Sequence, residues 1–122
     1  MPDLSASLNP SSWWGMGWES KVRVKNQKKE KIEKAKTLYL KALSKLEKAY
    51  DKDKKNADIL NYLGFALRKT GDFEKAEKFY LEGLKIDAGH LGINEYLGEL
   101  YVQTNRIELA KERLGVLKGC NC

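Results

Sequence analysis

The sequence predicts an all-α protein, a short right-handed α-solenoid in which antiparallel helix-turn-helix repeats stack on one another. The first observation is a period of 34 residues, because the tripeptide Tyr-Leu-Gly at 62–64 returns at 96–98. The second is the spacing of apolar residues at steps of three and four, which is typical of amphipathic helices. A period of this length is typical of stacked helix pairs, none of which can bury its apolar face alone. Such arrays are mostly binding scaffolds, so the period also indicates an interaction protein.

The composition fits one folded domain of 122 residues, of which 42% are hydrophobic and 33% charged. No apolar run approaches the roughly 20 residues that cross a bilayer, so no transmembrane segment is expected. Residues 1–10 lack the basic start and apolar stretch of a signal peptide. As written, the chain is expected to be cytoplasmic. An export signal upstream of the given sequence would make it an exported or periplasmic protein instead.

Positive charge is concentrated in one segment of the chain. The net charge is +6, but residues 21–56 alone hold 14 Lys and Arg against 5 Asp and Glu. The two interpretations are a solvated, lysine-rich helix face and a docking surface for an acidic partner.

Residues 1–20 are predicted to form a flexible leader. Ser, Pro and Gly interrupt any periodicity there, and all three tryptophans of the chain, Trp13, Trp14 and Trp18, fall within it. The indoles either fold back onto an apolar surface of the array or anchor a partner, because exposed tryptophans are costly and are enriched at contact sites.

Residues 21–56 are predicted to form a basic helical segment that carries a degenerate first repeat. Its apolar residues follow helical spacing, and no Gly or Pro interrupts it, which allows one long helix. Two helices with a turn near residues 36–38 are preferred, with Thr37 as the cap of the second. The reason is that Tyr39 and Ala42 keep the 34-residue register with Phe73 and Ala76.

The repeat at 57–90 has clear boundaries. Asn56 can cap a helix that begins at Ala57, Gly71 can take the left-handed turn conformation, and Asp72 can cap a second helix that ends near residues 87–89.

The repeat at 91–122 follows the same scheme and ends in Cys-x-Cys. His90 stands where Asn56 stood, residues 91–103 are helical, Asn105 replaces Gly71 in the turn, and a last helix runs from Ile107 to about Lys118. Small residues are expected where helices cross closely: Gly64, Gly98, Ala76 and Ala110.

These residues resemble the tetratricopeptide repeat family. Its characteristic spacing is carried in the central unit by Leu63, Gly64, Leu67, Gly71, Phe73, Ala76 and Tyr80, and is echoed by Leu97, Gly98, Tyr101, Ile107, Ala110 and Leu114. The sequence is similar to small bacterial members of the family that continue past a cysteine pair into one last helix. Here the sequence ends at Cys122, so a missing capping helix and self-association are both expected alternatives.

In this family the first helices of the repeats line a concave groove that binds extended peptides. The resemblance places eight partner-binding residues on it, with Val102 beside them: Asp58, Asn61, Phe65, Arg68, Lys69, Glu95, Glu99 and Gln103. The family's carboxylate clamp is not expected, because Tyr62, Tyr96 and Gly92 stand where that clamp has asparagine, arginine and lysine.

No catalytic, cofactor-binding or metal-binding site is predicted. The single histidine, His90, falls at a helix cap, and Glu95 and Glu99 are expected to be solvated. Cys120 and Cys122 fall short of a four-ligand zinc site. They are expected to be free thiols, with a strained disulfide in an exported protein and a metal or redox role as the alternatives.

The sequence therefore predicts a non-enzymatic scaffold that binds a protein or peptide partner, with no small-molecule substrate. The alternative is a binder of nucleic acid or another anionic surface through residues 21–56. Nucleic acid is less favoured, because lysines outnumber arginines there and the interleaved tyrosines, Tyr39 and Tyr50, lie on the apolar stripe.

Overall fold

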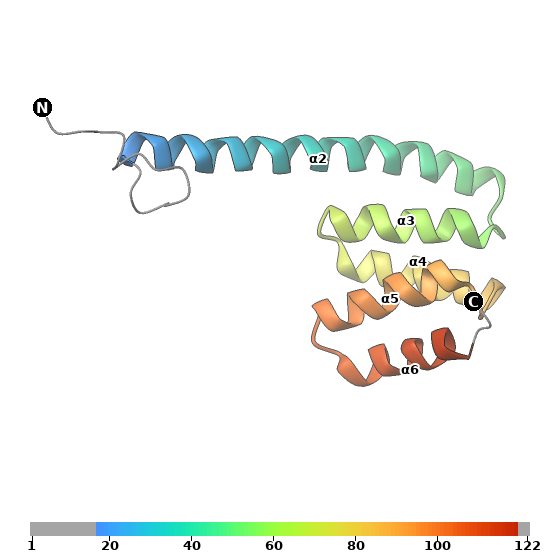
Figure 1. Cartoon of the computed structure of the whole chain (residues 1–122). Helices are drawn as coiled ribbons and strands as arrows, with labels where there is room; N and C mark the ends of the chain where they lie inside the picture. Colours follow the sequence, from blue (N-terminus) through green and yellow to red (C-terminus); the bar gives the residue numbers. More distant parts are fainter. Residues whose placement is uncertain (1–16, 120–122) are drawn as a thin grey trace, which may run out of the picture. The chain divides into compact units, whose positions relative to one another are not determined.

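The computed structural model describes residues 17–119, and that part of the chain contains helices and no β-strand (Figure 1). The helices are α2 (Trp18–Lys52), α3 (Ala57–Lys69), α4 (Phe73–Ile86), α5 (Leu91–Gln103) and α6 (Ile107–Lys118). Two compact units divide the chain, Met1–Ala35 and Lys36–Cys122, and the boundary lies within α2. The predicted all-α solenoid is confirmed. The predictions for Trp13, Trp14, Cys120 and Cys122 lie outside the described residues.

The preferred division of the basic segment into two helices is wrong, because α2 is continuous from Trp18 to Lys52. Residues 36–38 contain no glycine or asparagine that could take the left-handed conformation of a turn, and the surrounding lysines and alanines favour helix. The helix also begins within the predicted leader, and Gly17 accepts its first backbone hydrogen bond, from Lys21. The leader boundary at residue 20 is therefore too late.

The second part of α2 packs against the repeats of its own unit. Leu43 packs against the hydrophobic core. The Tyr50 ring meets Phe79 edge to face, with 5.7 Å between centroids. The Tyr50 hydroxyl donates to the Glu82 carboxylate at 2.9 and 3.0 Å, and this hydrogen bond raises the pKa of the Tyr50 phenol. Residues 36–52 thus pack against α3 and α4 through side chains of their apolar stripe.

The predicted caps of α3 and α4 are confirmed. Oδ1 of Asn56 accepts the backbone N–H groups of Asp58 at 3.0 Å and Ile59 at 3.3 Å. Gly71 has a φ of 94°, and Oδ1 of Asp72 accepts the N–H of Lys75 at 3.2 Å. These side chains satisfy N–H groups that a helix start leaves without partners.

The turns of the last repeat are confirmed as well. Nδ1 of His90 accepts the N–H of Ile93 at 3.1 Å and so caps α5. Asn105 has a φ of 60° and takes the place of Gly71 between α5 and α6. Arg106 precedes α6 without a side-chain cap.

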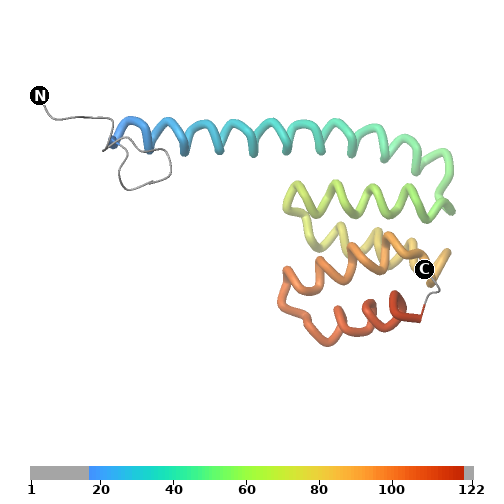
Figure 2. Tube along the Cα trace, in the orientation of Figure 1, coloured from blue at the N-terminus to red at the C-terminus, as the bar shows by residue number. Residues whose placement is uncertain are grey.

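The core lies where α5 packs on α3 and α4, and Figure 2 shows α3 to α6 running in alternating directions. Its fully or nearly fully buried members are Leu67, Ala76, Tyr80, Ile93, Leu97, Leu100 and Tyr101. At Gly64 an added Cβ would lie 2.6 Å from Cδ1 of Tyr80, so the predicted close approach there is confirmed. At Gly98 the nearest atom, Cβ of Arg113, is an ordinary 3.5 Å away, and Ala110 is only half-buried. A tight crossing of the two helices of a repeat is therefore found between α3 and α4 and not between α5 and α6.

Replacing Gly71 by alanine is expected to cost about 1 kcal/mol of unfolding free energy, because a side chain strains a residue at this positive φ. No atom lies within 4 Å of the added Cβ, so the loss would report backbone strain and not a clash. The matched variant is Gly71→Asn, which should cost less because Asn105 holds the equivalent turn. Urea denaturation measures both, and equal losses would contradict this account.

Candidate partner-binding groove

A row of three aromatic rings runs from α2 across α3 to α5. Phe65 on α3 meets Tyr39 on α2 edge to face, with 6.0 Å between centroids, and meets Tyr96 on α5 at 5.0 Å and a tilt of 47°. All three rings are half-buried. The row thus joins neighbouring helices while leaving part of each ring open to a ligand.

Two cations flank this row. The guanidinium carbon of Arg68 lies 5.6 Å from the Phe65 centroid and 5.9 Å from that of Tyr96, and Nζ of Lys69 lies 5.4 Å from Phe65. These are distances at which cations are attracted to ring faces. Nη2 of Arg68 also pairs with Oε2 of Glu99 at 3.0 Å, across the two repeats.

Arg68 and Glu99 differ in how far a partner can reach them. The Arg68 side chain is 11% exposed, whereas that of Glu99 is 50% exposed. Beneath them, burial raises the pKa of the Tyr80 phenol, and the charge of Arg68 opposes that rise. Arg68 is therefore mostly covered and contacts the rings of Phe65 and Tyr96, while Glu99 and Lys69 present charge to the solvent.

An open, mostly apolar hollow of about 380 Å³ lies between α2 and α3, at one end of the aromatic row. Tyr62 stands on its wall with 58% of its surface exposed, and Lys45 is its only charged lining residue. The full lining is Tyr39, Ala42, Lys45, Leu46, Tyr62, Phe65 and Ala66. Its size and chemistry suit one apolar side chain of a partner.

Two of the predicted groove residues, Asn61 and Asp58, make contacts within the protein. Asn61 is only 7% exposed, and a Cβ added to Gly92 would lie 2.6 Å from its Nδ2, so the start of α5 closes over it. The prediction that Asn61 offers a surface to a partner is therefore corrected. Asp58 instead accepts a 2.6 Å hydrogen bond from Nε2 of His90; Nδ1 of that ring accepts the Ile93 N–H, which leaves the proton on Nε2.

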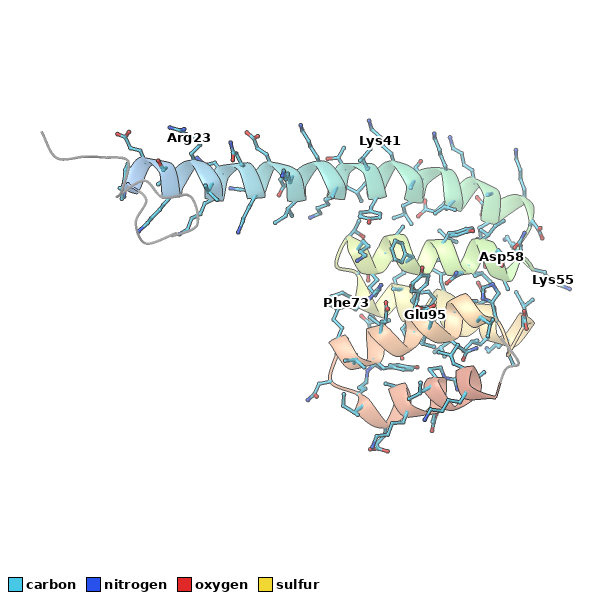
Figure 3. The ribbon with its side chains drawn as sticks, in the orientation of Figure 1. Arg23, Lys41, Lys55, Asp58, Phe73 and Glu95 are labelled. Atoms are coloured by element: carbon cyan, nitrogen blue, oxygen red, sulfur yellow. The ribbon has the colours of Figure 1, made fainter. Side chains whose placement is uncertain are left out.

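The other predicted residues lie at the surface of α3 and α5. Lys69, Glu95, Gln103 and Val102 are exposed, and Figure 3 marks Asp58 on α3 and Glu95 on α5. The tyrosines of the hollow and the row were not among the predicted binding residues. The return of Tyr62 as Tyr96 one period later was the available signal.

Residues 17–119 hold no group of three His, Cys, Asp or Glu side chains placed to bind a metal ion. The raised pKa of Tyr101 follows from burial and from Glu77, which also pairs with Arg106 at 2.9 Å. None of the helices between residues 17 and 119 is long and apolar enough to cross a membrane.

Stacked helix pairs, with a row of aromatic rings from α2 across α3 to α5, define the class of the protein as a helical-repeat protein. The model of the tetratricopeptide repeat family matches residues 24–88, more than half of the chain, and the chain belongs to this family. The match covers most of α2 together with α3 and α4. No curated protein matches the sequence.

Proposed function

We propose that this protein is a non-enzymatic scaffold that binds an extended segment of a protein partner across α3 and α5. Tetratricopeptide repeat proteins are typically protein-interaction scaffolds, so the family supports the general function. The observation that carries the particular site is the half-open row of Tyr39, Phe65 and Tyr96, which ends in the hollow beside Tyr62.

The chemistry of the groove describes the partner. An apolar or aromatic side chain of the segment would enter the hollow at Tyr62, because aromatic anchors in desolvated pockets supply most of the affinity at interfaces. Lys45 lines the hollow, and Nζ of Lys69 lies 5.4 Å from the centroid of Phe65, which lines it too, whereas Glu95 and Glu99 lie on α5. The segment would therefore carry an acidic residue beside its anchor and a basic residue toward α5, with Gln103 contributing polar contacts.

Peptide selection from a random phage-displayed library, with the full chain as bait, tests this proposal. Enriched peptides should share an aromatic or large aliphatic anchor next to an acidic residue. Their affinity should fall at least tenfold, or about 1.4 kcal/mol, in the double variant Tyr62→Ser with Lys69→Glu. Both side chains are exposed, so the melting temperature should change little.

The matched control is Leu81→Ser with Lys85→Glu on α4, where both side chains are also exposed. It makes the same change of charge and also replaces a large exposed side chain by serine, but outside the groove, and it should keep wild-type affinity. If both double variants bind the selected peptides equally, the groove is not the binding site.

The competing function is binding of nucleic acid or another anionic surface through residues 21–56. The structure favours it only in that α2 has no buried residue, so its lysines are accessible. Fluorescence anisotropy with a duplex oligonucleotide distinguishes the two. Binding that weakens steeply as salt rises, and that the groove variant leaves unchanged, would support this alternative and count against the groove.

A further inference from the structure

The hollow at Tyr62 lies where the 34-residue register would place one more helix. In that register residues 23–35 correspond to α3, and residues 39–52 correspond to α4. Helix α3 ends in a turn at residues 70–72 and packs on α4, whereas α2 continues as helix through residues 36–38. Residues 23–35 therefore cannot fold back onto residues 39–52 as α3 does onto α4.

The α2 wall of the hollow has counterparts on α4 that a helix covers. Ala42 and Leu46 line the hollow and are half-buried. Their counterparts 34 residues later, Ala76 and Tyr80, have no exposed surface. Gly64 of α3 lies against the Tyr80 ring, since a Cβ added there would be 2.6 Å from Cδ1 of the tyrosine. A helix in the position equivalent to that of α3 would cover Ala42 and Leu46 in the same way.

Tyr62, on the α3 wall, shows the same difference from its counterpart. It is 58% exposed, whereas Tyr96 one period later is half-buried. The Phe65 ring of α3 lies against Tyr96, with 5.0 Å between centroids. The residue in the register of Phe65 is Lys31, which has no ring to offer Tyr62. An aromatic residue of an added helix would meet Tyr62 as Phe65 meets Tyr96.

Residues 23–35 lack the apolar side chains that this position needs. Helix α3 buries three leucines, and the residues in their register are polar: Asn26 for Leu60, Lys29 for Leu63 and Glu33 for Leu67. Burying an amide and two charges in an apolar interface is costly. The same side chains disfavour residues 23–35 of a second copy. The position therefore suits a helix of another protein, with apolar residues at these places.

We infer, on the basis of the proposed function, that the partner segment enters the hollow as an amphipathic helix in the position equivalent to that of α3. The segment continues in extended form across α3 and α5. Its pattern follows α3, with large apolar residues at the first, fourth and eighth places and an aromatic residue at the sixth: Leu60, Leu63, Leu67 and Phe65 in α3. The apolar residues at the first, fourth and eighth places fall on one face of a helix.

The charges around the hollow favour an acidic helix. Lys45 lines the hollow and is exposed, and Nζ of Lys69 lies 5.4 Å from the Phe65 ring. Neither lysine forms an ion pair with a carboxylate within residues 17–119. Acidic residues beside the apolar face of the partner helix would pair with these two ammonium groups.

A synthetic 13-residue peptide with blocked, uncharged ends, the length of α3, tests the inference. It copies three leucines and a phenylalanine at their places in α3, with glutamate and alanine elsewhere: Leu60, Leu63, Phe65 and Leu67. Fluorescence anisotropy should show that it binds the full chain, and difference circular dichroism should show that it gains helix on binding. No binding at millimolar concentration, or binding without a gain of helix, would overturn the inference.

Two proline variants of the peptide test its conformation. Proline at the eighth residue, the place of Gly64, should weaken binding at least tenfold, because proline inside a helix removes a hydrogen bond and clashes with the preceding turn. The matched control carries proline at the first residue, where a helix tolerates it, and should keep the affinity. Equal affinities of the two variants would contradict a helical segment.

Charge reversal on the protein tests the position of the peptide. Lys45→Glu should weaken binding at least tenfold, because it opposes the glutamates of the peptide at the hollow. The matched control is Lys85→Glu on α4, which reverses an equally exposed lysine outside the hollow and should bind as the wild type does. Equal affinities of the two variants would place the peptide elsewhere.

The peptides selected from the phage library separate this inference from the proposed function. Apolar residues spaced by three and four in the enriched peptides support the helix. Spacing by two, with affinity still lost in the variant Tyr62→Ser with Lys69→Glu, would keep the groove and overturn the helix. Selected peptides that bind this variant as well as the wild type would overturn both proposals.

Two other occupants of this position would appear in the same titration. All three tryptophans lie within residues 13–18 and the peptide has none, so a shift of tryptophan emission to longer wavelength on binding would assign the position to the start of the chain. A wild-type dimer that the peptide dissociates, seen in sedimentation equilibrium, would assign it to a second copy. Either result would overturn the inference, and unchanged emission with an unchanged oligomeric state would support it.

Discussion

Truncating Leu97 to alanine is expected to lower the free energy of unfolding by about 2–5 kcal/mol. Leu97 has no exposed surface and lies on α5 within the core that joins the two repeats. Its removal takes away apolar burial and leaves a cavity that a close-packed core refills poorly. For a domain whose whole stability is about 5–15 kcal/mol, this loss is large enough to shift folding strongly.

The control for Leu97 is Leu81→Ala, which removes the same atoms from a side chain that is 42% exposed. It should cost well under half as much, because much of that surface is already in contact with water. Urea denaturation followed by circular dichroism measures both variants, at one protein concentration so that any association is held constant. Equal losses would show that α5 does not form the core of the array.

Features that depend on neighbouring residues could be predicted from the sequence. Asn56, Gly71, His90 and Asn105 were assigned to caps and turns, and each performs that role. A cap or a left-handed turn depends on the chemistry of one residue and on a helix within three positions of it. The 34-residue period then predicted the cap at His90 from that at Asn56, and the turn at Asn105 from that at Gly71.

The predicted division of α2 into two helices was wrong because the 34-residue register does not require a turn within the helix. Tyr39 packs on Phe65, and Leu43 packs on the core, as the second helix of a repeat should. A continuous helix satisfies both contacts, so the register of these residues is compatible with one helix or with two. Local helix propensity, with no Gly or Pro in the segment, was the stronger signal.

The sequence could predict which helix faces carry the groove residues. It could not predict which of those side chains contact one another, because that depends on how closely helices from different repeats approach. Gly92 illustrates this. Its replacement of a clamp lysine was visible in the sequence, yet its structural effect is to let the start of α5 close over Asn61. The pairs Asp58 with His90 and Arg68 with Glu99 join residues 32 and 31 positions apart. Sequence spacing gives no distance between side chains on separate helices.

Substituting alanine for Gly64 is expected to cost about 2 kcal/mol, although the change improves helix propensity. An added Cβ would lie 2.6 Å from Cδ1 and 2.7 Å from Cζ of Tyr80, well inside van der Waals contact. The Tyr80 ring is completely buried among core residues, so it cannot turn away from the added methyl group into solvent. Overpacking of this kind costs about 1–3 kcal/mol or more, which exceeds the roughly 1 kcal/mol that alanine gains over glycine in a helix.

The matched control for Gly64 is Gly115→Ala within α6, where no atom lies within 4 Å of the added Cβ. With the same gain in helix propensity and no clash, Gly115→Ala should stabilise the protein by up to about 1 kcal/mol. The two substitutions are chemically identical. Opposite changes in the free energy of unfolding would therefore show that the Tyr80 ring lies too close to Gly64 to admit a methyl group. A double variant, Gly64→Ala with Tyr80→Leu, should recover part of the loss, because the smaller side chain makes room for the methyl group. Stabilisation by Gly64→Ala alone would show that α3 and α4 do not cross at this glycine.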